Sequence, residues 1–431
     1  MTGVAGADHA AAGAAAWFRA CCHAEPGGVW HAPGRANLIG EHTDYNEGWV
    51  LPFALDAGVV AAAARRDDGV LEVRSRQAPR VQAHGPPAHG DAALGPPARG
   101  LPAHGPPAPG PPAPGDATTV AGSAPAVAEP VASLSPGSVK GWAAYPFGVA
   151  WALREAGYDV GGASLAIDAD LPQGAGLSSS AALECAVALA LVDLYALGVP
   201  RQELAAIARR AENDFVGVPC GIMDQSASLL CGAGHALLLD CRSGDTESVP
   251  LDPATAGLAL MLVDTGARHA LADGSYSLRR EQCEQAARAL GVRSLRDVDD
   301  ISELSRLADP VLRRRARHVI TENHRVLGTV RMLRAGELAE AGPLLHSSHS
   351  SLRDDFEISW PEADAAVAAA ERAGALGARM MGGGFGGSVI ALVPGDGAVV
   401  RSAIIEVYAR RGWPAPRFLS APPSAGAHRI G

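Results

Sequence analysis

The sequence has 431 residues, of which 48% are hydrophobic, and a formal net charge of −10 at pH 7. This length predicts two domains or one large bilobal unit, and the acidic balance disfavours a nucleic-acid-binding protein. No run of 18 apolar residues is present, which argues against a membrane span, and the Ala- and Gly-rich start lacks the basic residues of a signal peptide. We therefore expect a cytoplasmic protein that binds neither nucleic acid nor membrane, and we expect a monomer.

Cysteine and lysine usage excludes several kinds of site. The seven cysteines are irregularly spaced, without a CxxC pair, so neither a zinc site nor a disulfide framework is expected. Lys140 is the only lysine, and it has neither the Walker-A context nor the strand context of the protein-kinase lysine. If the protein binds ATP, it does so without either of these lysine devices.

Apolar periodicity predicts helices and strands that are partly segregated along the chain, which is typical of the α+β class. In chain order, the predicted elements are a short helix at 17–24, strands at 59–64 and 70–75, a helix at 142–156, a strand at 163–167, helices at 178–197 and 202–212, strands at 237–241 and 258–263, helical segments between 279 and 371, and strands at 387–393 and 417–420. The helix at 178–197 is apolar on most sides, which indicates burial.

Between Gly85 and Gly115 a glycine falls at every fifth position, and prolines fill the gaps. Proline removes backbone donors and fixes φ, so neither a helix nor a central strand is expected there. We predict an extended, disordered insertion at about residues 77–120. A tolerated repeat expansion in a surface loop is the favoured interpretation. A ligand for a proline-recognising domain is the alternative, with its partner unknown.

The segment from Pro33 to Asn46 concentrates charged and polar side chains. Arg35, Glu41, His42 and Asp44 lie within ten residues of one another. Carboxylate oxygens accept hydrogen bonds from hydroxyl groups, and such charge-assisted bonds are strong. The segment therefore suits a polyhydroxylated ligand, although an exposed polar loop or a capped helix start would have the same composition.

Two glycine-rich segments and one isolated aspartate add further candidates. Residues 171–181 form a Gly/Ser loop before the apolar helix, and free N–H groups at a helix N-terminus favour phosphate; an N-capped buried helix is the alternative. Residues 382–387 include five glycines, which suits close approach to a ligand or simply a tight turn before a strand. Asp224, in an otherwise apolar stretch, could be a general base or a helix cap.

Taken together, these segments resemble the galactokinases of the GHMP small-molecule kinase family. The resemblance rests on GRANLIGEHTDYNEGWVLPFAL at 34–55, PQGAGLSSSAALE at 172–184 and MMGGGFGGSV at 380–389. Further agreement lies in CGIMDQ at 220–225, TGARHALADGSYSLRREQCE at 265–284 and SSHSSLRDDFEIS at 347–359. It extends over nearly the whole chain, except for the proline repeat and the extreme N-terminus.

The resemblance implies a two-lobed fold with the active site in the cleft between the lobes. We place the N-terminal lobe at 1–215 and the C-terminal lobe at 216–431. The implied reaction is transfer of a phosphoryl group from ATP, with Mg²⁺, to the C1 hydroxyl of galactose. By matching position, Asp224 is expected to be the base, with Arg35 beside it.

The resemblance also assigns the remaining site residues by position. Sugar contacts are expected from Glu41, His42, Asp44, Gly221 and Tyr276. The triphosphate loop is expected to comprise Gly174, Ala175, Gly176, Leu177, Ser178, Ser179 and Ser180. Ser180 and Glu212 match the residues associated with magnesium.

Two positions depart from the family pattern. Met381 stands where a threonine is common, and Trp360 where a smaller residue is usual, which places affinity in doubt more than activity. The alternatives are a related sugar kinase acting on N-acetylgalactosamine or L-arabinose, a galactose sensor without catalytic activity, and a scaffolding protein. The sensor is disfavoured because the motif after the serines, Ser180-Ala181-Ala182, is intact.

Overall fold

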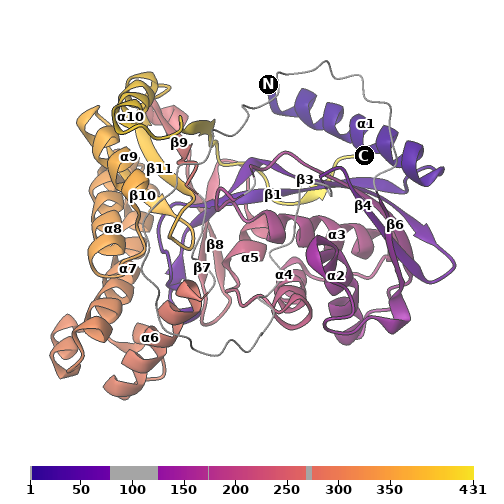
Figure 1. Cartoon of the computed structure of the whole chain (residues 1–431), viewed down its shortest axis with the longest axis horizontal. Helices are drawn as coiled ribbons and strands as arrows, with labels where there is room; N and C mark the ends of the chain where they lie inside the picture. Colours follow the sequence, from indigo (N-terminus) through magenta and orange to yellow (C-terminus); the bar gives the residue numbers. More distant parts are fainter. Residues whose placement is uncertain (1, 78–124, 173, 268–273) are drawn as a thin grey trace, which may run out of the picture.

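The computed structural model describes residues 2–77, 125–172, 174–267 and 274–431 (Figure 1). The Pro- and Gly-rich insertion predicted at 77–120 falls outside these residues except for Gln77. Gln173 of the predicted phosphate loop and residues 268–273 also lie outside them. Among the helices that the structure describes, none combines the length and apolar character needed to cross a membrane.

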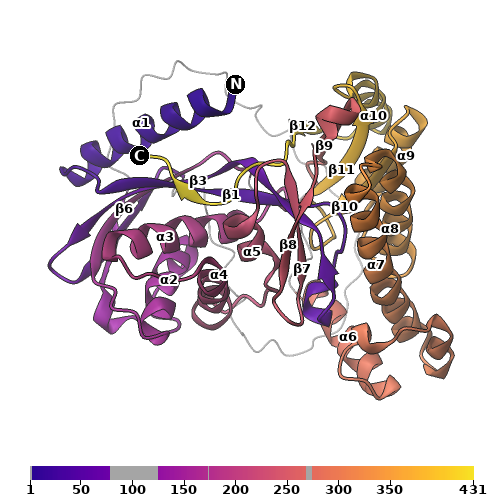
Figure 2. The same ribbon diagram turned by 180° about the vertical axis from the view of Figure 1, so that it is seen from behind.

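The larger sheet has six strands in the order β13-β1-β3-β6-β4-β5. All neighbouring strands are antiparallel except β4 and β6, which are parallel. Their bounds are β1 Gly28–Asn37, β3 Pro52–Arg66, β4 Val70–Ser75, β5 Val127–Pro130, β6 Gly162–Ala169 and β13 His428–Arg429. Helix α1 covers one face, and α2 to α5 lie on the other (Figures 1 and 2). These helices are α1 Thr2–Cys22, α2 Ala144–Glu155, α3 Ser179–Tyr195, α4 Arg201–Arg210 and α5 Met223–Leu230.

Alanines in β3 allow helices to pack on both faces of this sheet. Successive side chains of a strand point to opposite faces, so Ala61 and Ala63 join the core under α3 while Ala62 joins the cluster under α1. Helix α3 is apolar around its circumference and lies buried in the larger core, as the sequence predicted.

Helix α1 begins much earlier than the helix predicted at 17–24. The alanine-rich run before Trp17 has high helix propensity and continues the helix back to Thr2. Over residues 9–22, whose side chains the structure describes, a narrow stripe of this helix that includes Ala14 and Phe18 packs on the sheet. That stripe is too sparse to give a clear amphipathic signal in the sequence.

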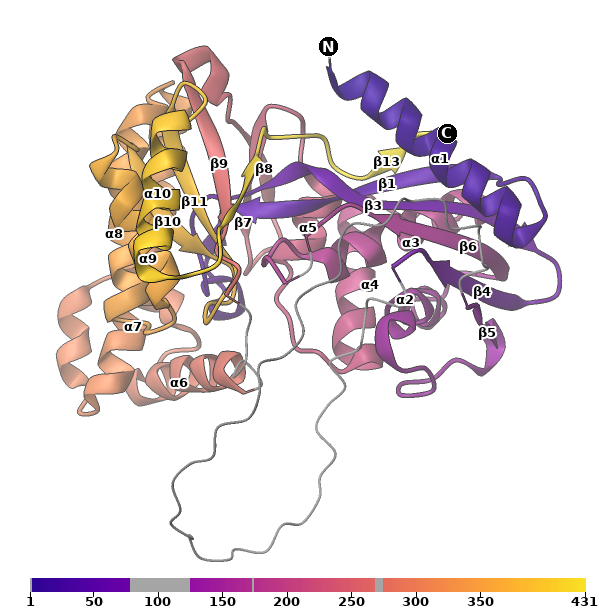
Figure 3. The ribbon, with the colours of Figure 1, turned by 45° about the horizontal axis from the view of Figure 1, so that its top comes forward.

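The second half of the molecule contains a four-stranded antiparallel sheet in the order β10-β11-β9-β12 (Figure 3). Its strands are β9 Leu258–Asp264, β10 Gly377–Met381, β11 Ser388–Pro394 and β12 Arg417–Ser420, and the helices of this half are α6 Ser275–Leu290, α7 Pro310–Arg334, α8 Gly342–Asp354, α9 Pro361–Arg372 and α10 Ala398–Arg411. Alternate residues of β9 belong to two different cores. Leu260 and Leu262 join the larger core, whereas Met261 and Val263 join the smaller.

Shorter elements connect the two halves. A three-stranded sheet runs in the order β2-β7-β8, with bounds Trp49–Val50, His235–Asp240 and Thr246–Pro250. A π-helix, η4, at Ala211–Val216 continues α4, so the regular α-helix predicted to reach residue 212 ends at Arg210. The short 3-10 turns are η1 Asp44–Asn46, η2 Val131–Ser133, η3 Gly141–Ala143, η5 Pro253–Ala256, η6 Leu295–Asp297, η7 Ile301–Arg306 and η8 Leu338–Ala341.

The α+β class is confirmed, while the division into lobes at residue 215 stays a prediction. The chain does not end within the second half. After β12, Ser424 forms a bridge with Ala54 of β3, and β13 pairs with β1 at the edge of the larger sheet. The final residues therefore complete the sheet that the first residues begin.

We predict that Phe18→Ala lowers the free energy of unfolding by about 3–5 kcal/mol, because the ring is fully buried between α1 and the sheet and its loss leaves a cavity. Urea unfolding followed by circular dichroism measures this change. Arg19→Ala is the matched control, since that side chain is 47% exposed and should change the free energy by less than about 0.5 kcal/mol. Equal effects of the two substitutions would contradict the packing described for α1.

Candidate active site

A buried arginine and a partly exposed aspartate form the centre of the candidate site. Arg35 Nε lies 2.9 Å from Asp224 Oδ1, and Arg35 Nη2 lies 3.1 Å from Asp224 Oδ2. The third guanidinium nitrogen, Nη1, donates to the carbonyl of Gly176 at 2.6 Å. The side chain of Arg35 is 7% exposed and that of Asp224 is 26% exposed. The two-point contact therefore fixes the carboxylate while leaving it accessible.

Local backbone features place these two side chains together. A shift in register between Pro33 and Arg35 interrupts the pairing of β1 with β3, as in a β-bulge, which re-aims a side chain. A Cβ on Gly34 would lie 2.7 Å from the carbonyl oxygen of Leu177, so glycine is needed where the Gly/Ser loop passes over β1. Asp224 is in the first turn of α5.

The Gly/Ser loop and the N-terminus of α3 lie against this pair. The Ser178 hydroxyl donates a short hydrogen bond to Asp224 Oδ2. Ser178 adopts a left-handed conformation with φ of 56° and does not cap the helix with its side chain. Ser388, next to the third glycine-rich segment, donates to the carbonyl of Ala175 at 2.7 Å. The second and third segments are thus held together at the Asp224–Arg35 pair.

Glu41 and His42 contact the backbone of the third glycine-rich segment. Glu41 Oε1 accepts from the backbone N–H of Gly382 at 2.9 Å and lies 3.1 Å from Arg379 Nη2. His42 Nε2 lies 3.2 Å from the carbonyl oxygen of Gly383. The first and third segments are 341 residues apart in the chain, yet they are in direct contact.

The contacts of His42 determine the positions of its protons. Burial, with a smaller contribution from His318, lowers the pKa of His42 to about 3, so the ring is neutral at pH 7. A carbonyl oxygen only accepts hydrogen bonds, so Nε2 must carry the proton that is donated to Gly383. His42 Nδ1 is therefore an acceptor, and the Tyr45 hydroxyl, 2.6 Å away, donates to it.

Asp44 lies beside Gly221, and the contact requires glycine. A Cβ on Gly221 would lie 1.7 Å from Asp44 Oδ2. Burial, and next the charge of Asp224, raise the pKa of Asp44 to about 6. Asp44 is therefore an ionised acceptor at pH 7, with a protonation change close to the physiological range.

Aromatic rings surround His42, close to Asp44 in the chain. The ring centroid of Tyr276, in the first turn of α6, lies 5.2 Å from that of His42 and 5.5 Å from that of Tyr45. The ring centroid of Phe356 lies 4.9 Å from that of His42. The sugar-contacting residues expected from the sequence therefore gather in one place.

Ser180 and Glu212 also lie near each other. Ser180 is in the first turn of α3, and Glu212 is carried by the π-helix η4. The Ser180 side chain acts to lower the pKa of the Glu212 carboxyl, an effect smaller than that of burial. Burial, and next the charge of Asp224, raise the pKa of Glu212 to about 7. A hydroxyl and a carboxylate fit Mg²⁺, which takes few protein ligands together with substrate phosphates. No group of three or more His, Cys, Asp or Glu residues arranged for a metal occurs among the described residues.

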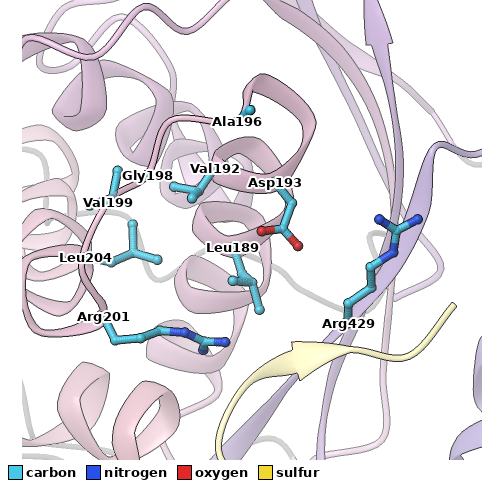
Figure 4. Close-up of a pocket in the computed structure, with 9 residues that line it drawn as sticks. All are labelled: Leu189, Val192, Asp193, Ala196, Gly198, Val199, Arg201, Leu204 and Arg429. Atoms are coloured by element: carbon cyan, nitrogen blue, oxygen red, sulfur yellow. The ribbon is translucent and has the colours of Figure 1, made fainter.

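A pocket of about 530 Å³ lies away from this cluster, between α3, α4 and the C-terminal strand (Figure 4). Its polar groups are engaged in internal contacts. Asp193 accepts from the Trp30 indole N–H at 2.6 Å, and Arg201 and Arg429 donate to backbone carbonyls at 2.6 and 2.8 Å. We therefore assign the site to the cluster around Asp224 on its chemistry rather than to this pocket.

Two buried residues and the partly buried Tyr45 in this cluster were not assigned roles from the sequence. Tyr45 sets the tautomer of His42, Arg379 contacts Glu41, and Gln225 contacts Glu212. An arginine within the apolar strand Gly377–Met381 is a usable sequence signal, because a fully buried arginine is rare unless it is paired. Tyr45 and Gln225 lie within the quoted motifs, but nothing in the sequence shows which atoms they contact.

Family models match three parts of the chain. The galactokinase galactose-binding signature matches residues 16–65, the GHMP kinase N-terminal domain matches residues 144–232, and the GHMP kinase C-terminal domain matches residues 330–410. The matched regions include Arg35, Asp224 and the glycine-rich segment after β10.

Similar proteins extend over most of the chain. The galactokinase of Streptomyces coelicolor is 47% identical over 96% of this chain and 97% of its own, and that of Mycobacterium tuberculosis is 44% identical over 85% and 89%. The crystal structure of Lactococcus lactis galactokinase complexed with galactose superposes with a TM-score of 0.81 at 30% identity, covering 97% of this chain and 99% of that chain. Mevalonate kinase of Methanococcus jannaschii shares the fold, with a TM-score of 0.59 at 13% identity over 91% and 96%. The chain therefore belongs to the GHMP kinase family and, within it, to the galactokinases.

Proposed function

We propose that the protein transfers the γ-phosphoryl group of ATP to the C1 hydroxyl of galactose, giving galactose 1-phosphate and ADP. The observation that carries the proposal is the accessible Asp224 carboxylate, held at two points by Arg35 beside the Gly/Ser loop. This arrangement joins a proton acceptor to a phosphate-binding loop. The galactokinase relatives supply the substrate class.

In this proposal, an oxygen of Asp224 accepts the proton of the C1 hydroxyl as that hydroxyl attacks the γ-phosphorus. Arg35 holds the Asp224 carboxylate in position and offsets negative charge that develops on the transferred group. Ser178 already donates to Asp224 Oδ2 and orients that oxygen. Phosphoryl transfer depends mostly on positioning and charge neutralisation, so few residues are needed.

The sugar would lie against Asp44, Gly221 and Tyr276. The close contact of Asp44 with the backbone of Gly221 supports one rigid wall for the hydroxyl groups. Glu41 has one carboxylate oxygen engaged with Gly382, and its second oxygen is assigned to a sugar hydroxyl. Both nitrogens of His42 are engaged in the present arrangement, so a bond from Nε2 to the sugar would replace the bond to Gly383.

The nucleotide is assigned to the loop that contains Gly174, Ala175, Gly176, Leu177, Ser178, Ser179 and Ser180. The positive end of α3 and the backbone N–H groups favour its phosphates, which removes the need for a phosphate-loop lysine. Ser180 and Glu212 would hold Mg²⁺, which neutralises charge on the phosphate oxygens when bound. Both predicted lobes, residues 1–215 and residues 216–431, contribute residues to the site. This supports substrate binding between the two lobes.

A sugar panel tests the proposed reaction directly. ADP release is measured with purified protein, ATP and Mg²⁺ against galactose, 2-deoxygalactose, N-acetylgalactosamine, glucose and L-arabinose. We expect turnover with galactose and little with glucose. The two sugars altered at C2, 2-deoxygalactose and N-acetylgalactosamine, report how strictly the site requires a hydroxyl at that carbon. Galactose binding without turnover of any sugar would overturn the proposal in favour of a sensor.

We predict that Asp224→Asn reduces kcat by about 10²- to 10⁴-fold, because the change removes the proton acceptor while keeping the side-chain volume. ADP release measures the loss, and calorimetry should show that nucleotide affinity stays within about twofold. Asp214→Asn is the matched control. Asp214 lies in the π-helix η4, two residues from Glu212, but its side chain is 55% exposed and pairs with Arg210. Turnover near that of the unmodified protein would remove Asp224 from the role of base.

The pH dependence of galactose binding should report Asp44. Its pKa is raised to about 6, so Asp44 is a carboxylate above pH 6 and becomes neutral as the pH falls through 6. Loss of the charged acceptor should raise the KM for galactose below pH 6, with a limiting slope of about tenfold for each pH unit. His42 cannot cause this transition, because its pKa is about 3.

The measurement is KM for galactose between pH 5 and 8 at saturating ATP and Mg²⁺. Asp44→Asn removes this titrating group, so its KM should be higher, and the rise in KM below pH 6 should be absent. An unchanged slope in that variant would assign the transition to another group.

A further inference from the structure

Gln225 follows Asp224 in α5 and is fully buried. Its amide nitrogen Nε2 donates to Glu212 Oε2 at 2.8 Å and to Glu184 Oε2 at 3.0 Å. The NH₂ group of the amide has two donor hydrogens, and its nitrogen faces both carboxyl groups. Gln225 Oε1 has no hydrogen-bond partner among the described residues, and the amide nitrogen also lies 3.8 Å from Cys220 Sγ.

This one amide joins three elements of the site. Ser180 and Glu184 are separated by one helical turn of α3 and share a face, while Glu212 is carried by the π-helix η4. π-helices often occur at functional sites. The side-chain hydrogen bonds of Glu212 come from Cys220 and Gln225, which lie outside its own element.

The other contacts of Glu212 are weaker or are already part of the candidate metal site. Cys220 Sγ lies 3.3 Å from Glu212 Oε2, and a thiol is a weak donor. Ser180 of α3 also influences the Glu212 carboxyl, but its hydroxyl is itself assigned to the metal. Gln225 is therefore the strong neutral donor that can hold Glu212 when Ser180 is bound to a cation.

We propose that Gln225 is a positioning residue that fixes Glu212 for the magnesium ion and ties its placement to that of the neighbouring Asp224. The inference rests on the proposed assignment of Ser180 and Glu212 to the metal. Groups that orient a metal ligand without touching the metal commonly change metal affinity by 10- to 100-fold. Gln225 is placed to have this effect, since it contacts Glu212 but is not itself assigned to the metal.

The test is Gln225→Met, which keeps side-chain length and removes both donated hydrogen bonds. Binding of Mn²⁺ to the protein–ADP complex, measured by electron paramagnetic resonance, gives a readout that does not depend on turnover. We expect the Mn²⁺ dissociation constant to rise at least about tenfold and the galactose dissociation constant, measured by calorimetry, to stay within about twofold. Unchanged Mn²⁺ affinity, or an equal loss of both affinities, would overturn the proposal.

Two further variants separate positioning from general destabilisation. Ser228→Ala is the matched control: Ser228 is equally buried on the same helix and donates to the carbonyl of Pro33 at 2.8 Å. It should lower the melting temperature without changing Mn²⁺ affinity. The double variant Glu184→Gln/Gln225→Glu returns one amide to the cluster, and Mn²⁺ affinity within about threefold of the unmodified protein is expected if the amide is what matters. Failure of this folded double variant to recover affinity would count against the proposal.

Glu212→Gln distinguishes this inference from the proposed function. If that substitution leaves Mn²⁺ affinity unchanged, the assignment of Glu212 to the metal is wrong, and the role of Gln225 falls with it. If Glu212→Gln weakens Mn²⁺ binding and Gln225→Met does not, the metal assignment stands and only the positioning role is wrong.

Discussion

The contact between Arg35 and Asp224 is the constraint on which the site depends. A guanidinium that is 7% exposed is costly to bury unless it is paired and hydrogen-bonded, and here all of its nitrogens have acceptors. Meeting this requirement fixes the bulge in β1, the start of α5 and the path of the Gly/Ser loop, because each of them supplies part of the contact. The same contact leaves Asp224 oriented and open to a ligand, so the structural requirement and the proposed chemistry are met by one arrangement.

Glycine appears in the site where backbones approach one another. Gly34 admits the carbonyl of Leu177, and Gly221 admits the carboxylate of Asp44. Glu41 and His42 then bind the backbone of Gly382 and Gly383. The segments that are distant in sequence are thus joined largely through backbone groups. In each of these contacts one partner is a backbone group. A substitution that removes a side-chain partner atom can therefore act only at Glu41, His42 or Asp44.

The sequence predicted the motifs far better than their contacts. Strands at 70–75 and 417–420 and the buried helix α3 are found as predicted, because their apolar patterns are continuous. Strand β1 was not predicted, since Arg35 and Asn37 interrupt its apolar pattern although both are buried; their partners lie in distant segments, which periodicity does not report. The π-helix and the tautomer of His42 likewise depend on tertiary contacts. Similarity to galactokinases indicated which residues belong to one site. The contacts of Tyr45 and Gln225 are visible only in the folded structure.

The C-terminal tail has a mechanical consequence. Strand β12 belongs to the smaller sheet, and Ser424 is bridged to Ala54 of the larger one. Residues 421–424 can reach at most about 14 Å when fully extended. As long as the bridge is intact, this short segment limits how far strand β12 can move from β3. A wider separation of the two sheets at this edge would therefore require loss of the Ser424–Ala54 bridge.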